Sequence, residues 1–157
     1  MNIPFWEETY QNDNIFTFGP EPNDSLVEVQ NFLEFSDNII DVGCGDGHNV
    51  LYLAKEGYKN IDAFDISENA IAKLRRIAAR ENLSSINGWV ENLCEFNFVK
   101  QYKLIMSFGT LHFVSREDWL EFIWDIISFK SYVFEDEHPN VPKHLHASNK
   151  IIARRIK

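Results

Sequence analysis

One short stretch decides the fold of this chain: residues 41–47, Asp-Val-Gly-Cys-Gly-Asp-Gly, which directly follow Asn38-Ile39-Ile40. The acidic residue closes a short buried strand, and three glycines, each two positions from the next, then turn the chain into a helix. Glycine permits a positive φ and lets a ligand approach the backbone where any Cβ would block it. The stretch therefore predicts a strand, a ligand-binding turn and a helix.

The glycine spacing separates two families of cofactor-binding loop. A dinucleotide fingerprint, G-x-G-x-x-G, needs its third glycine at position 48, where this chain has His48. An NAD(P) enzyme is therefore the weaker alternative. The remaining pattern, D-x-G-x-G-x-G, resembles the first motif of class I S-adenosylmethionine-dependent methyltransferases. The resemblance implies that this loop binds S-adenosylmethionine, with S-adenosylhomocysteine as product, through Asp41, Gly43, Cys44, Gly45 and Gly47.

A second acidic residue, Asp65, closes the next predicted strand, Ile61–Asp65. It lies about twenty residues after the glycines, where open α/β folds place a carboxylate that accepts ribose hydroxyls. Helix capping is the alternative, because Asp65 and Ser67 both precede a helical pattern. Together with Asp41 and the glycines, the position favours the cofactor role, which the resemblance extends to the adjacent Ile66.

The resemblance implies further cofactor contacts after the third and fourth strands. Asn92 and Leu93 follow the predicted third strand, where the family holds an adenine-contacting Asp. The amide oxygen of Asn92 can still accept from an exocyclic amine, although an Asn in an ordinary turn is the alternative. Ser107 ends the fourth strand, beneath the expected methionine end of the cofactor.

Composition bounds the class of protein. The 157 residues suffice for one domain and are too few for two, and a hydrophobic content of 45% predicts a globular chain. A net charge of −9 disfavours a nucleic-acid partner, because phosphate contact needs a basic surface. We see no signal segment, no apolar run of membrane-spanning length and no C-x-x-C. We therefore expect a cytoplasmic protein with no membrane partner.

Strand and helix patterns alternate along the chain, which predicts a parallel, doubly wound α/β sheet with the ligand at the carboxyl ends of the strands. We expect one methyltransferase-like domain, residues 1–157, with an N-terminal lid or helix (1–36), a cofactor-binding core (37–125) and a C-terminal hairpin (126–157). Predicted helices cover residues 24–35, 49–56, 68–82 and 115–125, and predicted strands beyond the second cover 88–90, 102–107, 126–134 and 149–154. The N-terminal aromatic residues pack either as core or as a lid over the cofactor.

The chain departs from the methyltransferase pattern between residues 125 and 126. The family's sheet normally has seven strands, but this chain leaves no room for a fifth strand and its helix, a unit on the order of 30 residues long. We therefore expect an abbreviated Rossmann-like sheet of about six strands with the last one antiparallel. Either the hairpin pairs beside the fourth strand, or that strand is an open edge that invites a homodimer or a strand swap.

The acceptor side is less well specified, because methyl transfer is an in-line displacement that needs mainly alignment and desolvation. The tail over residues 135–146 resembles the D-E…K-H-x-H segment of the tellurite-resistance methyltransferases, which borders the acceptor. The resemblance implies a small-molecule acceptor, such as a soft oxyanion or a thiol. We expect His112, His144 and His146 to face it as the catalytic side chains. Solvated loop histidines are the alternative, and without a further fixed ligand we expect no metal at the H-x-H pair.

The sequence thus predicts an S-adenosylmethionine-dependent methyltransferase that acts on a small molecule. A different class of function is the alternative: a module that binds S-adenosylmethionine or S-adenosylhomocysteine with little or no turnover. The shortened sheet motivates this alternative, because the cofactor residues belong to strands one to four and part of the acceptor wall is missing.

Overall fold

The structure is a computed structural model that describes residues 5–98, 100–110, 113, 115, 126–136 and 144–153; within these ranges the side chains of residues 6–115 are described. Its elements in chain order are α1 (Phe5–Thr9), α2 (Asp24–Val29), the 3-10 turn η1 (Gln30–Phe32), β1 (Asn38–Val42), α3 (His48–Glu56), β2 (Asn60–Asp65), α4 (Glu68–Arg80), β3 (Ile86–Val90), β4 (Leu104–Met106), β5 (Ile126–Asp136) and β6 (His144–Ala153).

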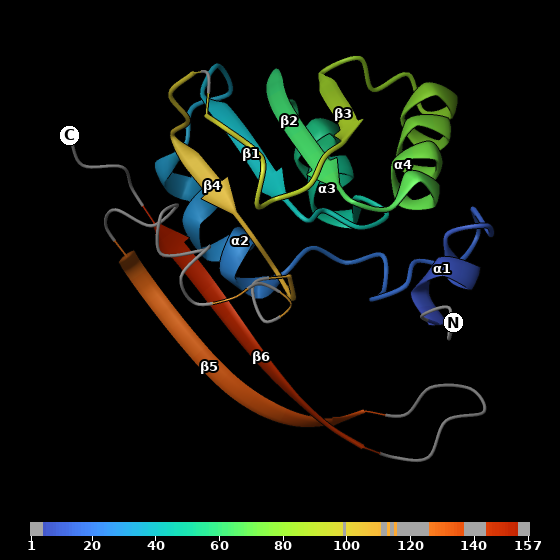
Figure 1. Ribbon diagram of the computed structural model, residues 1–157. Coiled ribbons are helices and arrows are strands. Elements are labelled where there is room, and N and C mark those ends of the chain that lie inside the picture. Colours follow the sequence, from blue (N-terminus) through green and yellow to red (C-terminus); the bar gives the residue numbers. More distant parts are fainter. Residues whose placement is uncertain are drawn as a thin grey trace.

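Four parallel strands form the centre of the sheet, in the order β3-β2-β1-β4 (Figure 1). Asp41 of β1 lies beside Ala63 of β2 and Met106 of β4. The carboxyl ends of the three strands therefore meet at one edge, which is the edge where ligands bind in open α/β sheets. The predicted parallel α/β sheet is confirmed.

The strands β5 and β6 form a long antiparallel hairpin, whose register runs from Ile126 beside Ala153 to Asp136 beside His144. One residue pair, Ile105 with Ala153, joins β6 antiparallel to β4. Figure 1 shows the hairpin extending from this junction beyond the parallel strands.

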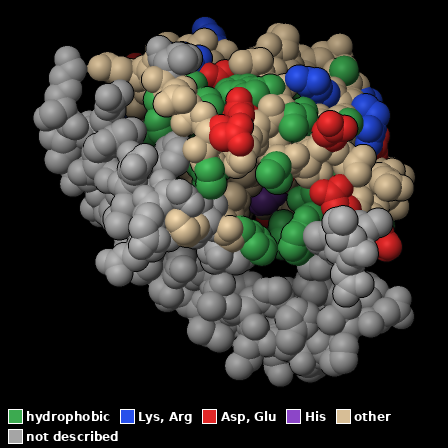
Figure 2. Space-filling model, viewed as in Figure 1, with side chains coloured by type: hydrophobic (Ala, Val, Ile, Leu, Met, Phe, Trp, Pro, Cys, Tyr) green, Lys and Arg blue, Asp and Glu red, His purple; other side chains and the backbone are tan. Residues whose placement is uncertain are grey.

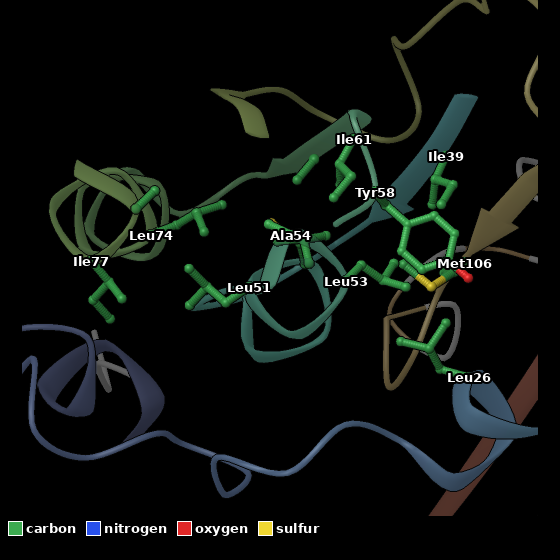
Figure 3. Packing of buried hydrophobic residues seen from close by; sticks show 14 of the residues in the cluster. Leu26, Ile39, Leu51, Leu53, Ala54, Tyr58, Ile61, Leu74, Ile77 and Met106 are labelled. Carbon is green, nitrogen blue, oxygen red and sulfur yellow. The ribbon is translucent and has the colours of Figure 1, made fainter. Parts of the chain in front are cut away.

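Aliphatic side chains from α2, α3 and α4 cover one face of the sheet. Ile39 of β1 and Ile61 of β2 contribute to the same buried cluster as Leu51 of α3 and Leu74 of α4 (Figure 3). Because successive strand residues point to opposite faces, Ile40 belongs to a second cluster on the other side. The helices are thus held by strand residues at every second position.

Leu74 of α4 fits against two glycines from different parts of the chain. A Cβ on Gly47, which precedes α3, would lie 2.4 Å from Cδ1 of Leu74, and a Cβ on Gly88 of β3 would lie 3.1 Å from its Cδ2. Gly47 also has a φ of +82°, which favours glycine. This packing sets α4 close to both the glycine-rich loop and β3.

The other face of the sheet carries aromatic side chains. Phe64 of β2 lies 4.5 Å from Phe96 between ring centroids, and Phe96 lies 5.0 Å from Phe98. Figure 1 shows the segment between β3 and β4 crossing this face. Among the described residues, the apolar cluster here includes no helical side chain. The predicted helix over 115–125, which would begin a second helical layer, lies outside the described residues except for Ser115.

Asp62 of β2 projects from the same aromatic face and is 5% exposed. Its carboxylate accepts hydrogen bonds from the hydroxyl of Tyr102 and from Nδ2 of Asn87, the latter at 3.0 Å. Nζ of Lys100 lies 2.8 Å from Oδ2 of Asp62. A charged residue can therefore stand within this face because three partners satisfy it.

The predicted helix over residues 24–35 is too long. α2 ends at Val29, a 3-10 turn begins at Gln30, and Leu33 is extended, with a φ of −107°. The carbonyl oxygen of Gln30 accepts from the N–H of Leu33 at 3.0 Å and from the hydroxyl of Tyr58 at 3.1 Å. The N–H of Glu34, which would continue the helix by donating to that carbonyl oxygen, donates instead to Oδ2 of Asp37 at 2.8 Å.

Two other boundaries match the prediction closely. The helix predicted over 49–56 is α3, and Gly57 ends it in the left-handed conformation with a φ of +102°.

No helix among the described ranges has both the length and the apolar character that crossing a membrane requires.

Candidate functional site

The glycine-rich loop between β1 and α3 is fastened to the end of β2. The N–H groups of Gly43 and Cys44 both donate to the carbonyl oxygen of Phe64, at 2.8 and 3.0 Å. Gly43 has a φ of +72°, and a Cβ there would lie 2.1 Å from Oγ1 of Thr110. Thr110 also donates to the carbonyl oxygen of Gly43 at 3.1 Å. At this position the chain's own Thr110 requires the glycine, whereas the sequence alone suggested the approach of a ligand.

Asp65 joins this loop to the start of α4. Its Oδ2 accepts from the N–H of Gly45 at 2.8 Å, and its Oδ1 accepts from the N–H of Ser67 at 2.9 Å. Burial raises the pKa of the Asp65 carboxyl above its ordinary value, and these backbone hydrogen bonds partly oppose the effect. A carboxylate offers more lone pairs than these backbone N–H groups use, so Asp65 can still accept from a ribose hydroxyl.

Helix capping is the work of Ser67. Its Oγ accepts from the N–H of Ala70 at 3.2 Å, and Ser67 is the N-cap of α4. Asp65 instead forms an Asx turn before the helix, because its side chain accepts from the N–H of Ser67, two residues later. The capping alternative therefore describes Ser67, and it leaves Asp65 at the edge of the loop.

Three buried polar side-chain atoms have no hydrogen-bond partner within the described part of the chain: Oδ2 of Asp41, Nδ1 of His48 and Oγ of Ser107. Asp41 lies near the end of β1, His48 begins α3 and Ser107 directly follows β4; Asp41 is 1% exposed. Burial and the nearby Asp65 raise the pKa of Asp41 to about 8, and burial lowers the pKa of His48. A buried acid without a cation, beside a hydroxyl, fits the ammonium group of an amino-acid ligand.

Figure 2 shows a hollow on one face of the molecule, where hydrophobic side chains (green) gather around a histidine (purple). Ile66, directly after Asp65, is 70% exposed, which leaves its side chain free to pack against the planar ring of a ligand. Cys44 is buried in the aliphatic cluster, and burial raises the pKa of its thiol. It therefore behaves as a small apolar residue of the loop.

The residues after β3 are arranged differently from their predicted role. Oδ1 of Asn92 accepts from the N–H of Cys94 at 3.1 Å, and its Nδ2 donates to Glu95 at 3.1 Å. This is the ordinary turn that the sequence left open as an alternative. Leu93 is 8% exposed and packs in the apolar cluster of the aromatic face. An adenine contact from either residue stays a prediction.

The acceptor side is only partly described. His112 and the side chains of His144 and His146 lie outside the described residues, so their predicted roles stay predictions. Phe113 is described, and its ring centroid lies 5.8 Å from that of Trp6 in α1. The segment that follows β4 thus meets the N-terminal helix.

Sequence reasoning missed two residues that join the N-terminal segment to the loop. Lys73 of α4 and Asp46 of the loop form an ion pair with an Nζ–Oδ2 distance of 2.9 Å, and neither side chain is more than 1% exposed. A signal was present, because Lys73 lies on the apolar face of α4 between Ala70 and Leu74. A lysine on such a face requires a buried partner.

The parallel sheet, the acid–glycine loop after β1 and the acid that ends β2 define the class I S-adenosylmethionine-dependent methyltransferase fold. The family model of the tellurite resistance protein TehB matches residues 20–131. The chain belongs to the TehB family.

Individual relatives agree with this assignment. The "Probable S-adenosyl-L-methionine-dependent methyltransferase TehB" of Haemophilus influenzae is 35% identical over 79 residues, which cover 50% of this chain and 27% of that protein. The matched part of the chain therefore spans about a quarter of the length of this curated relative.

Two solved structures share the fold. The crystal structure of TehB from Haemophilus influenzae matches with a TM-score of 0.68 at 18% identity, over 97% of this chain and 66% of that chain. Coclaurine N-methyltransferase bound to N-methylheliamine and S-adenosylhomocysteine matches with a TM-score of 0.54 at 17% identity, over 70% and 37%.

Proposed function

We propose that this chain binds S-adenosylmethionine and transfers its methyl group to a small molecule. The observation that carries the proposal is the pair of acids at the carboxyl edge: Asp65, bonded to the N–H of Gly45, and Asp41, whose buried Oδ2 has no partner among the described residues. Membership of the TehB family supports the same activity. When bound, the cofactor supplies an electrophilic methyl group on a sulfonium.

The chain's own residues bind and orient the ligand. Asp65 accepts the ribose hydroxyls with the lone pairs that Gly45 and Ser67 leave open. Asp41 and Ser107 face the amino-acid end, where a carboxylate offsets an ammonium charge. Tyr10, which is 4% exposed, belongs to a lid that excludes water and so strengthens these interactions.

Calorimetry with S-adenosylmethionine and S-adenosylhomocysteine tests the proposal. Asp65→Ala should weaken binding by roughly 1.5–3 kcal/mol, because charge-assisted hydrogen bonds to the ribose are lost. Asp62→Asn is the matched control, since Asp62 lies on the same strand and projects from the other face. An unchanged dissociation constant in Asp65→Ala, or a wild-type protein that ignores both ligands at millimolar concentration, would contradict the proposal.

We propose a soft oxyanion or a thiol as the acceptor, with His112, His144 and His146 facing it. The tellurite-resistance family supports this choice, as does the aromatic contact of Trp6 with Phe113 beside His112 in the sequence. A methyl-transfer screen with tellurite, selenite and small thiols should find activity that His112→Ala lowers. Methylation of protein substrates alone would contradict it.

A binding module with little or no turnover is the second candidate. It is favoured by the pairing of Ile105 with Ala153, which places β6 directly beside β4, where the family's fifth strand would stand. Tight binding of S-adenosylhomocysteine with no transfer to any acceptor would select this candidate over the enzyme.

We also propose that the hairpin of β5 and β6 completes an abbreviated six-stranded sheet with an antiparallel last strand. We propose further that two copies of the chain can exchange these hairpins, so that the hairpin of one copy pairs with β4 of the other. Within the described residues β6 is paired to β4 through Ile105 and Ala153, which supports both ideas because a short junction is easily replaced by the same junction in a second copy. Light scattering that finds monomer alone would contradict the exchange.

The few cysteines, Cys44 and Cys94, support a cytoplasmic location.

A further inference from the structure

A buried ion pair links three separate parts of the chain. Nζ of Lys73 in α4 lies 2.9 Å from Oδ2 of Asp46 in the glycine-rich loop. Lys73 also donates to the carbonyl oxygens of Ile15 and Thr9, the latter at 3.2 Å. Oδ2 of Asp46 accepts from the N–H and the hydroxyl of Thr17, at 2.9 and 3.1 Å. The N-terminal segment, residues 9–17, is thereby tied to both the loop and α4.

Stability alone explains this pair poorly. Removing two charges from water costs about as much as their attraction returns, and apolar residues of similar volume often do as well. A buried pair does impose one geometry, since each charge tolerates no other neighbour. The carbonyl oxygens of Thr9 and Ile15 and the hydroxyl of Thr17 fix the segment at both of its ends.

The geometry that the pair imposes brings the segment onto the proposed ligand site. The rings of Tyr10 and Phe16 lie 6.0 and 5.3 Å from Nζ of Lys73, so the segment wraps around the ammonium group. The hydroxyl of Tyr10 lies 3.1 Å from the place where a Cβ on Gly45 would be. Gly45 is the glycine whose N–H holds Asp65. The segment therefore reaches the loop at the point that orients the proposed ribose acceptor.

We propose that Lys73 is a positioning residue for the cofactor site: through Asp46 it holds residues 9–17 against the glycine-rich loop, so that the segment forms one wall of the site. Lys73 acts through its partners rather than by contact with the ligand. This inference rests on the proposed function, because the ligand in question is S-adenosylmethionine.

A second ion pair, which joins α4 directly to the N-terminal segment, provides a control. Arg76 of α4 lies 2.8 Å from Oδ1 of Asp13, and the two side chains are 48% and 27% exposed. It holds the same segment to α4 at the surface, where Nη2 of Arg76 also donates to the carbonyl oxygen of Tyr10 at 3.4 Å. An effect of Lys73 that is specific to the site should be absent from Arg76→Gln.

Calorimetry with S-adenosylhomocysteine tests the proposal on Lys73→Met, Arg76→Gln and the double variant Asp46→Asn/Lys73→Met, which leaves no stranded acid. Measurements are made where circular dichroism shows each variant folded. We expect both lysine variants to bind at least about tenfold more weakly, and Arg76→Gln to stay within about twofold. A purely structural role would lower the melting temperature and leave the affinity of the folded protein unchanged, and that result would overturn the proposal.

Hydrogen exchange of residues 9–17 gives a readout that needs no ligand. Exchange should be faster in both lysine variants than in the wild type or Arg76→Gln. Should the lysine variants fail to fold, Thr17→Val removes one hydrogen bond to Asp46 and keeps the pair, and an unchanged affinity in that variant overturns the proposal.

The two proposals fail in different ways. If the wild type binds neither S-adenosylmethionine nor S-adenosylhomocysteine, the proposed function falls and this inference falls with it, whatever the exchange shows. If the wild type binds and a lysine variant with a released segment binds equally well, this inference alone falls.

Discussion

Two acid–lysine pairs in this protein have the same chemistry and opposite surroundings. The nitrogen–oxygen distance is 2.9 Å in Asp46–Lys73 and 2.8 Å in Asp62–Lys100. The side chain of Lys73 is 0% exposed, whereas that of Lys100 is 42% exposed. Water can replace the partner of an exposed charge, but nothing replaces the partner of a buried one. Burial, rather than distance, therefore decides how much each pair matters.

The same contrast holds between Asp62 and Asp41, whose carboxylates differ in the partners that stabilise their charge. Burial alone would raise the pKa of Asp62, but hydrogen bonds from Lys100, Tyr102 and Asn87 outweigh it and lower the pKa. Oδ2 of Asp41 has no such partner among the residues that the structure describes, and burial together with the nearby Asp65 raises the pKa of Asp41. The aromatic face thus stabilises its acid, whereas the carboxyl edge keeps an acid that lacks a cation.

Breaking the buried pair should have the largest effect. Lys73→Met leaves the Asp46 carboxylate buried without its cation, which should lower the free energy of unfolding by about 3–5 kcal/mol. Urea unfolding followed by circular dichroism measures the loss. The double variant Asp46→Asn/Lys73→Met should recover part of it, and a single-variant loss below about 1 kcal/mol would contradict the comparison.

Neutralising the unsupported acid should stabilise the protein. Asp41→Asn should raise the free energy of unfolding by about 1–3 kcal/mol near neutral pH, because a buried group that cannot ionise replaces one that can. The pKa of Asp41 is about 8 in the folded protein and 3.8 ordinarily, so the folded state holds a proton that the unfolded state releases. Wild-type stability should therefore fall as the pH rises through this interval, and the advantage of the Asp41→Asn variant should grow.

Urea titrations of both proteins at pH 5 and pH 8 check the sign. Equal advantages at the two pH values would show that Asp41 titrates alike in the folded and unfolded states.

Removing one support of the aromatic-face acid should have a smaller effect. Tyr102→Phe deletes the hydroxyl that donates to Asp62 and leaves Lys100 and Asn87 in place. We expect a loss of about 1–2 kcal/mol, because one hydrogen bond to a charged group is lost while two other partners remain. Thermal unfolding of the two proteins measures it, and a loss as large as that of Lys73→Met would reverse the ranking of the two regions.

The exposed lysine should matter least. Lys100→Met removes a charge that is 42% exposed, so the loss should be at most about 1 kcal/mol and should shrink further in high salt. Comparison of Lys100→Met with Lys73→Met in the same denaturant series isolates burial as the variable. A salt-independent loss would indicate that Lys100 is less accessible than its exposed fraction implies.

The parts of the fold that the sequence predicted well are governed by local signals. The turn after β1 follows from three glycines in left-handed conformations, and the N-cap of α4 follows from Ser67. The acid at Asp65 follows from its distance to the glycines. Each of these signals acts over a few residues, or over one βαβ unit, and survives in the folded protein.

The parts that the sequence missed depend on contacts between distant residues. The helix predicted over 24–35 ends early: the carbonyl oxygen of Gln30 accepts from the distant Tyr58, and the N–H of Glu34 donates to Asp37 instead of continuing the helix. The pair of Asp46 with Lys73 spans 27 positions, so no local pattern specifies it. Tertiary packing, rather than propensity, decides both.

The fit of Leu74 against Gly47 and Gly88 makes three positions share one volume. A methyl group added at position 88 would need about the same volume removed at position 74, so alanine at 88 should accompany valine or alanine at 74 among homologous chains. A smaller residue at position 74 would not permit a side chain at position 47, because the left-handed backbone there disfavours any residue but glycine. The contact between α4 and β3 can thus vary during evolution, whereas the contact of α4 with Gly47 of the glycine-rich loop stays fixed.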